Sequence, residues 1–280
     1  MLTLVTMPIG NGADLSPRAR AALLAADVIA AEDTRKAKDV LARADVHPQA
    51  QWITHHDHNQ THSATGVLRL LQQGKNVAYI SDAGMPGIAD PGEALVRAAV
   101  AVGHSVDLIP GPCAALQALV LSGLPTGRFS FIGFLPRRDN ELETLLQSLS
   151  ARPETLIFYE SPRRVVDTVQ CMARLWGPRP AALARELTKT YQEILRQDLV
   201  SLAATLAVRP EILGEITLVV SGQLEPAETL MGEALTAKVR ALLAQGLSAK
   251  EVKAALKGLP GVDGSEVYAL AVQLLQNKTP

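Results

Sequence analysis

The sequence predicts an α/β fold in which short strands alternate with helices. Short runs rich in β-branched residues, typical of strands, alternate with Ala- and Leu-rich amphipathic runs, typical of helices. Of the 280 residues, 48% are hydrophobic and 20% are charged, so the chain can bury large cores and does not have the composition of a disordered protein. Because strands and helices alternate, we expect a parallel open sheet.

The first half of the chain contains the clearest alternation. Residues 2–7 (LTLVTM) are the first predicted strand, and Ser16 followed by Pro17 has the pattern of a helix N-terminus. Gly74 has the place of a glycine that ends a helix. The apolar run at 114–124 is shorter than the ~18 residues of a membrane span, so it predicts a buried helix. Further strands are expected at 28–31, 52–54, 76–81 and 105–110, and a further helix at 93–102.

A change in composition near residues 124–133 indicates a linker that leads into a second set of elements. Strands are expected at 155–160, 180–186 and 215–222, with a helix at 163–175. After Gln223 the pattern is helical, and Ser248 with Glu251 has the spacing of a capping box. We therefore expect domains at residues 1–122, 123–224 and 225–280.

Charge, aromatic content and cysteine content limit the classes of function and the cellular compartment that the sequence fits. The formal net charge of −1 argues against a nucleic-acid binder held by bulk charge, although it leaves room for a local basic patch. The aromatic residues (4 Phe, 4 Tyr, 2 Trp) are too few for a base-stacking sheet. Cys113 and Cys171 cannot form a disulfide framework, and the sequence has neither a signal-peptide pattern nor a membrane span. We expect a cytoplasmic protein without membrane contact.

Unusual turns follow three of the predicted strands. They cover residues 8–11, 81–92 and 110–115, and all are rich in Gly and Pro. The carboxyl ends of parallel strands share one edge of a sheet, where ligands commonly bind. Turns between strands and helices are often Gly- and Pro-rich for structural reasons alone. Three together, one of them twelve residues long with two Asp, favour a cradle for a small cofactor.

Polar clusters follow predicted strands at residues 31–35, 55–59, 160–164 and 185–189. The histidines of the second cluster invite a metal-site interpretation, but their spacing matches no recurrent zinc pattern, and we expect no metal. Glu32 or Asp33 has a simpler alternative role, as a carboxylate at a helix N-terminus. The last two clusters mix acids and bases and suit an ion-pair network or phosphate contacts.

Ten short sequence strings, which include the turns and polar clusters above, resemble in their order and spacing the small-subunit ribosomal RNA methyltransferase I group of the tetrapyrrole methylase superfamily. The resemblance covers roughly residues 2–222, and the tail VYALAVQL resembles the group's small C-terminal helical domain. The group usually has Thr at the positions of Met7 and Met85, and Leu is common at that of Gly12. The strings are PIGN, AEDTR, HDHN, SDAGMPGIADPG, PGPCAAL, SGLP, GFLP, FYESPRR, RELTK and GEITLVVSG.

The resemblance implies a fold, an activity and a cofactor site. The implied fold has two α/β domains, a parallel Rossmann-like sheet first and a mixed sheet second, followed by a small helical domain. The implied enzyme is a homodimer that uses S-adenosylmethionine to methylate the ribose 2′-hydroxyl of a cytidine in the decoding centre of 16S rRNA, within the small ribosomal subunit. The cofactor is expected in a cleft between the α/β domains, in contact with Pro8, Ile9, Asp82, Met85, Ile88, Cys113, Ala114, Phe158, Tyr159, Leu183, Ala184, Ile216 and Thr217.

Methyl transfer to a hydroxyl benefits from a base or a polarising cation. The sequence does not select one group, because His56, Asp57, His58 and Glu160 also lie on the predicted edge. The candidates that we put forward as catalytic are Glu32, Asp33, Glu186 and Lys189. The RNA-binding candidates are Arg35, Lys36, His56, His58, Arg137, Arg138, Arg163 and Arg164.

Two other functions remain open on the sequence. A porphyrinoid C-methyltransferase would use the same fold and cofactor on a different acceptor, and AEDTR, HDHN and RELTK argue against it. A protein that binds rRNA as an assembly factor without methyl transfer is the second alternative. Only the departures at Met7 and Met85 support it.

Overall fold

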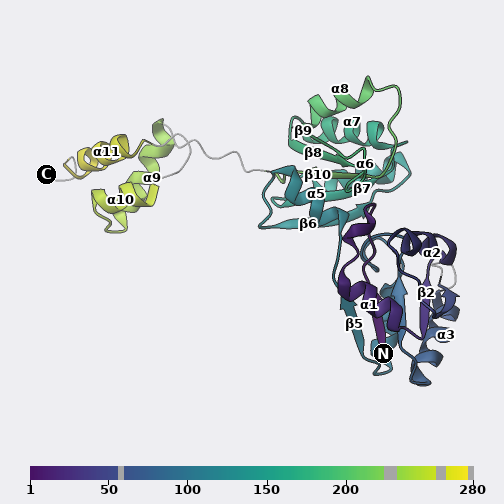
Figure 1. Cartoon of the computed structure of the whole chain (residues 1–280). Helices are drawn as coiled ribbons and strands as arrows, with labels where there is room; N and C mark the ends of the chain where they lie inside the picture. Colours follow the sequence, from purple (N-terminus) through teal and green to yellow (C-terminus); the bar gives the residue numbers. More distant parts are fainter. Residues whose placement is uncertain (56–59, 224–231, 257–262, 277–280) are drawn as a thin grey trace. The chain divides into compact units, whose positions relative to one another are not determined.

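The computed structural model describes residues 1–55, 60–223, 232–256 and 263–276. The chain divides into two compact units, Met1–Gly222 and Gln223–Pro280, and each is considered by itself. The described residues of the larger unit contain two sheets with helices on their faces (Figure 1). The expected combination of a parallel sheet, a mixed sheet and a small helical tail is confirmed.

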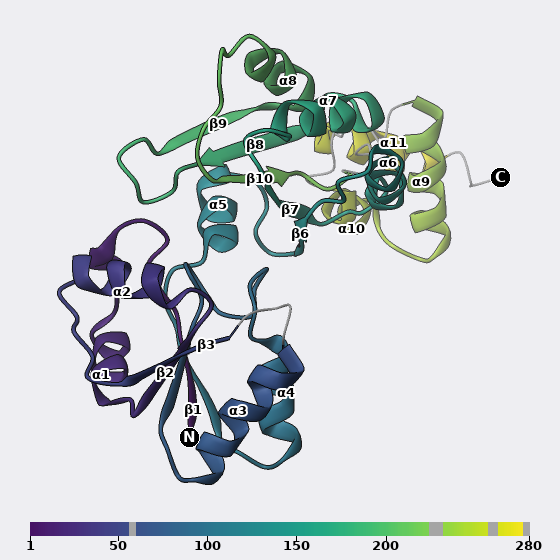
Figure 2. The same cartoon turned by 90° about the vertical axis from the view of Figure 1, so that its right-hand side faces the viewer.

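The first sheet is parallel throughout and has the strand order β3-β2-β4-β1-β5. One face packs on α1 and α2 and the opposite face on α3 and α4, as Figure 2 shows. Every strand therefore ends at the same edge, which brings the special turns together. The elements are β1 (Leu2–Val5), α1 (Pro17–Ala25), β2 (Val28–Ala31), α2 (Thr34–Arg43), β3 (Gln51–Thr54), α3 (Gln60–Gln72), β4 (Val77–Ile80), α4 (Glu93–Ala101) and β5 (Val106–Ile109).

Local signals in the sequence set the helix ends. Ser16 Oγ accepts a hydrogen bond from the backbone N–H of Ala19 at 3.1 Å, and Pro17 is the first residue of α1. Gly74 lies beyond the end of α3 with φ +79°, a backbone conformation that favours glycine. Both expectations are confirmed. A short 3-10 turn, η1 (Gly12–Asp14), precedes α1.

The second sheet is mixed, with the order β6-β7-β10-β8-β9. Strand β10 runs antiparallel to both of its neighbours, whereas β6 and β7 are parallel. Helices α6, α7 and α8 pack on one face and α5 on the other. The elements are α5 (Ala114–Ser122), β6 (Phe129–Phe134), α6 (Asp139–Leu149), β7 (Thr155–Glu160), α7 (Val165–Trp176), β8 (Pro180–Arg185), β9 (Glu193–Asp198), α8 (Leu199–Ala207) and β10 (Ile216–Val220).

Two sequence predictions need correction here. The helix predicted to be buried over 114–124 is α5, but its Leu116 and Val120 are 47% and 71% exposed, because only one side of the helix packs on the second sheet. Strand β9 was not predicted, since its sequence EILRQD carries few apolar residues and its side chains are partly exposed. The domain boundary at residue 122 stays a prediction: it places α5 with the first domain, although α5 packs against the second sheet.

The smaller unit is helical in its described residues. It contains α9 (Gly232–Ala244), α10 (Ala249–Leu256) and α11 (Gly264–Gln276), which pack around Val239, Val252 and Val267. The predicted capping box is confirmed: Glu251 accepts from the Ser248 backbone N–H at 2.8 Å, and Ser248 Oγ accepts from the Glu251 N–H at 3.4 Å. Within the described residues, no helix is long and apolar enough to cross a membrane.

Candidate functional site

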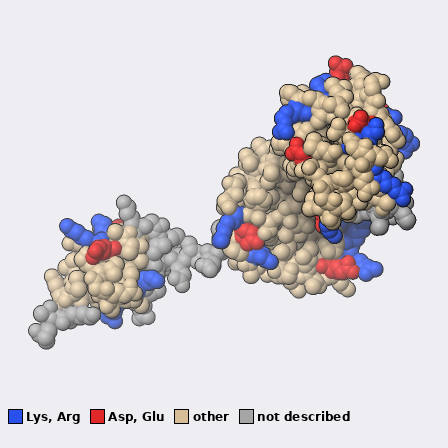
Figure 3. Space-filling model, turned by 90° about the horizontal axis from the view of Figure 1, so that it is seen from below, with Lys and Arg blue, Asp and Glu red and all other residues tan. Residues whose placement is uncertain are grey.

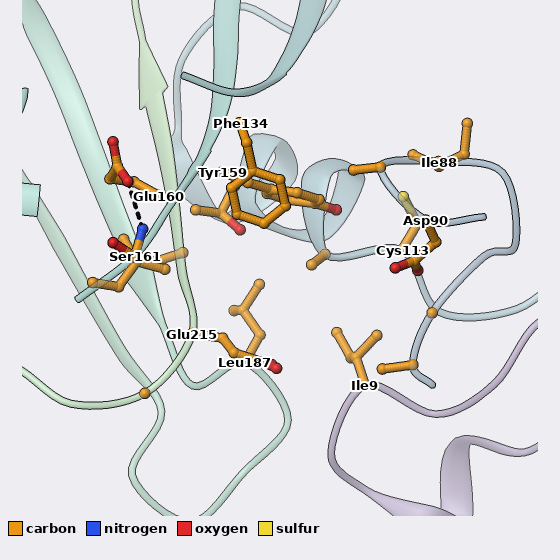
Figure 4. Close-up of a pocket in the computed structure, with 18 of the residues that line it drawn as sticks. Ile9, Ile88, Asp90, Cys113, Phe134, Tyr159, Glu160, Ser161, Leu187 and Glu215 are labelled. Atoms are coloured by element: carbon orange, nitrogen blue, oxygen red, sulfur yellow. Dashed lines mark hydrogen bonds between the residues drawn. The ribbon is translucent and has the colours of Figure 1, made fainter. Parts of the chain in front are cut away.

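A pocket of about 400 Å³ lies between the two sheets of the larger unit (Figure 4). We name its two sides by their construction. The turn wall follows strands of the first sheet and consists of Ile9, Asp82, Ala83, Gly84, Met85, Ile88, Ala89, Asp90, Cys113 and Ala114. The strand wall belongs to the second sheet and consists of Phe134, Tyr159, Glu160, Ser161, Pro162, Ala184, Leu187, Gly214, Glu215, Ile216 and Thr217.

Backbone conformation shapes the turn wall. Gly84, at φ +69°, exchanges hydrogen bonds with Met7, from Met7 N to Gly84 O at 2.8 Å and from Gly84 N to Met7 O at 3.1 Å. Gly92 adopts φ +139°, and a Cβ there would lie 2.9 Å from Cε1 of Tyr79. A side chain would therefore be strained at Gly84, and at Gly92 it would also collide with Tyr79.

Of the two positions where Met replaces the family's usual Thr, only one reaches the pocket. Met7 is fully buried in the core of the first sheet, whereas Met85 lines the turn wall. At Met7 the backbone carries the contact with the neighbouring turn, so the side chain there is free to be apolar.

Alternation along the strands shapes the strand wall. Thr217 of β10 pairs with Tyr159 of β7 on one side and with Ala184 of β8 on the other, so these three side chains form one row facing the pocket. The preceding residues on β7 and β8, Phe158 and Leu183, point to the opposite face and are fully buried against the helices there.

An aromatic group stands at one end of the strand wall. The Tyr159 ring meets Phe131 and Phe134 edge to face, with centroids 5.0 and 5.5 Å apart. Its hydroxyl accepts from the Ala115 backbone N–H at 3.2 Å, which joins β7 to the first turn of α5. Burial raises the pKa of Tyr159 to about 12, so this hydroxyl stays protonated at neutral pH.

Among the described residues, four carboxyl groups line the pocket. Asp82 accepts from Lys36 Nζ at 2.8 Å, and Glu215 lies 3.1 Å from Lys189 Nζ. The Glu160 side chain is fully buried and accepts from the Ser161 backbone N–H at 2.7 Å, the bond dashed in Figure 4, and from the Thr168 hydroxyl at 2.8 Å.

The fourth carboxyl group, Asp90, is in a different environment. Burial, and then the negative charge of Glu32, raise the pKa of Asp90 to about 7. A carboxyl group with this pKa exchanges its proton near neutral pH.

Comparison with known proteins assigns the chain to a family. The model of the tetrapyrrole (corrin/porphyrin) methylases matches residues 1–203. The chain belongs to the tetrapyrrole methylase family. Two curated relatives carry the name ribosomal RNA small subunit methyltransferase I. The protein of Halalkalibacterium halodurans is 41% identical over 95% of this chain and 93% of its own length, and that of Micromonospora olivasterospora is 38% identical over 95% and 85%.

Solved structures of other methyltransferases share the fold. The methyltransferase CobJ superposes with a TM-score of 0.58 at 22% identity, over 79% of this chain and 94% of its own. Uroporphyrin-III C-methyltransferase of Thermus thermophilus, complexed with S-adenyl homocysteine, superposes with a TM-score of 0.53 at 21% identity, over 79% and 96%. As a member of this family, the chain is a methyltransferase that uses S-adenosylmethionine.

The pocket fits the chemistry of this cofactor. Apolar side chains such as Ile9 and Leu187 suit its adenosyl and aliphatic parts, and the carboxylate of Asp82 suits its cationic amino group. Of the predicted cofactor residues, Pro8, Phe158 and Leu183 are not part of the lining. The structure brings together at the pocket the others, which are Ile9, Asp82, Met85, Ile88, Cys113, Ala114, Tyr159, Ala184, Ile216 and Thr217.

The predicted catalytic residues of the first domain lie beside the pocket. Asp33 is the N-cap of α2 and accepts from the backbone N–H groups of Arg35 at 2.9 Å and Lys36 at 3.4 Å. The hydrogen bond from Arg35 lowers the pKa of Asp33. Glu32 precedes it at the end of β2, and neither residue lines the pocket. The alternative role for Asp33, as a carboxylate at a helix N-terminus, is the one seen.

The predicted catalytic residues of the second domain, Glu186 and Lys189, form an ion pair of 2.8 Å outside the pocket lining. Glu186 Oε1 also accepts from the Glu215 backbone N–H at 2.9 Å. Burial opposes the ionised form of Glu186, but these hydrogen bonds outweigh it and lower its pKa. The segment adjoins the first domain, because a Cβ on Gly10 would collide with the Lys189 side chain. Catalytic roles for these four residues stay predictions.

The predicted RNA-binding residues differ in whether their side chains are exposed or already bonded within the protein. Arg164 donates to the backbone carbonyls of Leu135 and Pro136, so it holds the loop after β6. Arg138 pairs with Glu141 at 2.9 Å. Among the described residues, Arg35, whose side chain is 91% exposed, forms an ion pair with the nearby Asp33 alone.

Other basic candidates complete this set. Lys36 is bound to Asp82, while Arg137 and Arg163 are exposed and form no ion pair with any described residue. His56 and His58 lie outside the described residues. In the view of Figure 3 the basic side chains are interspersed with acidic ones. Among the described residues, no cluster of three or more His, Cys, Asp or Glu could hold a metal.

Several pocket residues were not among the predicted site residues. Asp90 is inside the long turn that the sequence singled out, and Leu187 and Glu215 are inside RELTK and GEITLVVSG. For Leu187 and Glu215 a position within a quoted string was the only signal, and Phe134 has the same signal because it is inside GFLP. Asp90 is also one of the two Asp of the long turn.

Proposed function

We propose that this protein transfers a methyl group from S-adenosylmethionine to the ribose 2′-hydroxyl of cytidine 1402 in 16S rRNA, at the decoding centre of the small ribosomal subunit. The observation that carries the proposal is the pocket between the two walls, in a chain 38–41% identical to proteins named ribosomal RNA small subunit methyltransferase I. The cytoplasm is the compartment that this function requires.

The residues of the pocket suit a transfer governed by positioning. The bound cofactor supplies a methyl group activated by its sulfonium. Ile9 and Leu187, which face the pocket from opposite walls in Figure 4, exclude water from the reacting atoms. The row of Tyr159, Ala184 and Thr217 forms a flat surface for the cofactor. Holding two reactants in an attack geometry can by itself contribute several kcal/mol, up to ~7–11 kcal/mol.

Recognition of RNA is proposed to depend on separated basic groups and a folded target. Arg35, Arg137 and Arg163 are exposed, and acidic side chains lie among the basic ones. A surface of mixed charge gains little from counterion release, so short RNA binds weakly at physiological salt. An assembled small subunit can engage several such groups together.

We also propose a homodimer. On α5 the apolar side chains of Leu116 and Val120 are one helical turn apart and are 47% and 71% exposed. Neighbouring exposed apolar side chains supply part of the contiguous apolar patch that an association surface needs. Sedimentation of the purified protein over a range of concentrations tests this part of the proposal.

The decisive experiment maps 2′-O-methylation on rRNA from cells that lack this protein and on the same subunits after incubation with the enzyme. We expect 2′-O-methylation at cytidine 1402 to be absent from rRNA of the cells that lack the protein, and to be restored after incubation with the enzyme. Assembled subunits should react faster than naked 16S rRNA, and a short hairpin should react slowest. Equal rates on hairpin and subunit contradict recognition of a folded particle.

Two controls address the alternative functions. Methylation of a tetrapyrrole precursor in place of RNA would support a porphyrinoid C-methyltransferase. Calorimetry that detects no S-adenosylmethionine binding would support a non-catalytic assembly factor.

A further inference from the structure

The carboxyl groups of the pocket differ in their partners. Lysine ammonium groups pair with Asp82 at 2.8 Å and with Glu215 at 3.1 Å. Glu160 is fully buried and accepts hydrogen bonds on both carboxylate oxygens. Asp90 forms no ion pair with any residue that the structure describes, although it lines the same pocket.

The groups that act on Asp90 come from several elements and are mostly acidic. Glu32 follows β2, Asp82 follows β4 and Glu215 precedes β10, and all three oppose the ionised form of Asp90. The Ser81 hydroxyl favours the ionised form, but less strongly than burial and Glu32 oppose it. Together with burial, these surroundings raise the pKa of Asp90 to about 7, so its carboxylate is a stronger base than an ordinary aspartate.

Two further polar groups line the same pocket. The Cys113 side chain belongs to the turn wall with Asp90, and the protonated Tyr159 hydroxyl belongs to the strand wall (Figure 4). Neither supplies a positive charge that would offset burial and the acidic neighbours of Asp90.

The backbone holds Asp90 in place. Ala89, just before it, has φ +56°, a left-handed conformation that is strained for any residue with a side chain. The turn closes on itself through hydrogen bonds from Gly87 N to Pro91 O and from Ile88 N to Met85 O, each 3.2 Å. Strain of this kind is typical of functional sites, where the surrounding structure maintains it.

We propose that the carboxylate of Asp90 accepts the proton of the attacking ribose hydroxyl during methyl transfer. The inference rests on the proposed function. The bond between the methyl carbon and the sulfonium sulfur breaks and its electron pair stays on sulfur, while a new C–O bond forms to the ribose oxygen. The O–H bond of the hydroxyl breaks and the proton moves to Asp90, which becomes a neutral carboxylic acid and later releases the proton to water.

The test compares Asp90→Asn with the wild type in single-turnover methylation of small subunits. The amide keeps the size of the side chain but cannot take the proton. We expect the methyl-transfer rate to fall about 100-fold, the usual order for loss of a general base. The affinity for S-adenosylmethionine, measured by calorimetry, should stay within about threefold. The wild-type rate should rise with pH up to about 7 and then level off, and this rise should disappear in the variant.

Two further variants sharpen the result. Asp90→Glu restores a carboxylate and should recover part of the rate together with the rise below about pH 7. Asp107→Asn removes an exposed carboxylate of β5, outside the pocket lining, and should leave rate and pH profile unchanged. Circular dichroism of each variant confirms that it is folded.

Two results overturn the inference. One is an Asp90→Asn rate and pH profile equal to those of the wild type. The other is affinity for S-adenosylmethionine reduced more than about tenfold with the rise in rate intact, which would make Asp90 a ligand of the cofactor's cation. Failure of the proposed function looks different, because the wild type would then bind S-adenosylmethionine and leave RNA unmethylated.

Discussion

The turn wall and the strand wall of the pocket are built by different means. In the turn wall, glycines at positive φ, such as Gly84 and Gly92, bend the backbone toward the pocket. In the strand wall, the backbone is regular and the alternation of side chains decides which residues face the pocket. A sequence displays the first kind of wall through its Gly and Pro residues. It displays the second only if the face of each strand is known.

The largest effect that tests this comparison is expected on β7, where adjacent residues face opposite ways. Phe158→Ala should lower the free energy of unfolding by about 3–5 kcal/mol, because Phe158 is fully buried in the core below the sheet. The affinity of the Phe158→Ala variant for S-adenosylmethionine should stay within about twofold of the wild-type value, measured by calorimetry at a temperature where the variant is folded. Urea denaturation measures the loss of stability.

The neighbouring residue provides the matched control. Tyr159→Phe removes the hydroxyl that accepts from Ala115 N and should cost only about 0.5–1.5 kcal/mol, while it alters the surface of the pocket. Cofactor affinity that drops in Phe158→Ala and not in Tyr159→Phe would reverse the assignment of the two faces.

The same contrast explains what the sequence could predict. The three special turns were recognised and do lie at one edge of the first sheet, since parallel strands require it. Phe158 and Leu183 were predicted together with their neighbours because motif matching selects consecutive residues, whereas a strand directs them to opposite faces. The pairing of Thr217 with both Tyr159 and Ala184 depends on long-range strand order, which no local pattern contains.

The predicted catalytic residues show a related limit. A cluster of charged residues after a strand predicts where polar groups gather, and Glu186 and Lys189 do come together after β8 in an ion pair of 2.8 Å. Which carboxyl group is free of cations depends on the three-dimensional neighbours of each. Asp82 and Asp90 are both aspartates of the same Gly- and Pro-rich turn, so the sequence does not distinguish them. In the structure Lys36 forms an ion pair with Asp82 and not with Asp90.

The second-largest effect concerns the ion pairs that support each wall. Next to the strand wall, Glu193 accepts from Arg209 and Arg185, and these hydrogen bonds lower the pKa of Glu193 to about 2. Glu193→Gln should cost about 1–2 kcal/mol at pH 7. Because the folded state depresses this pKa, the contribution is present above the ordinary value of 4.5 and is lost as pH falls toward 2.

The turn wall has a weaker counterpart. Lys36, which pairs with Asp82, is 66% exposed, so Asp82→Asn should change stability by at most about 0.5 kcal/mol. Urea denaturation of both variants between pH 2.5 and 7 makes the comparison. Equal losses in the two variants, or a loss in Glu193→Gln that persists at the acid end, would contradict it.

A smaller effect is expected where the turn wall meets α5. Cys113 is the N-cap of this helix, and its side chain makes no capping hydrogen bond. Serine is a preferred N-cap residue, so Cys113→Ser should raise stability by about 0.5–1 kcal/mol. The rate of methyl transfer should stay within about threefold if the thiol is only a wall residue. Intact cofactor binding with a lost rate would instead indicate a chemical role for the thiol.

A further small effect on stability is expected at Ala89, and it tests whether strain in the turn wall serves the site. Relief of the left-handed conformation by Ala89→Gly is worth about 1–2 kcal/mol, but the more flexible glycine costs about 0.5–1 kcal/mol through the unfolded chain. The net gain should be between about 0 and 1.5 kcal/mol by urea denaturation. If the strain keeps Asp90 in place, the methyl-transfer rate should fall severalfold as stability rises, with cofactor affinity unchanged. Ser150→Gly at the end of α6, outside the pocket, is the matched control, since Ser150 has φ −59° and gains nothing from glycine. A rate that stays constant in Ala89→Gly would show that the hydrogen bonds of the turn suffice to hold Asp90 and that the strain has no part in catalysis.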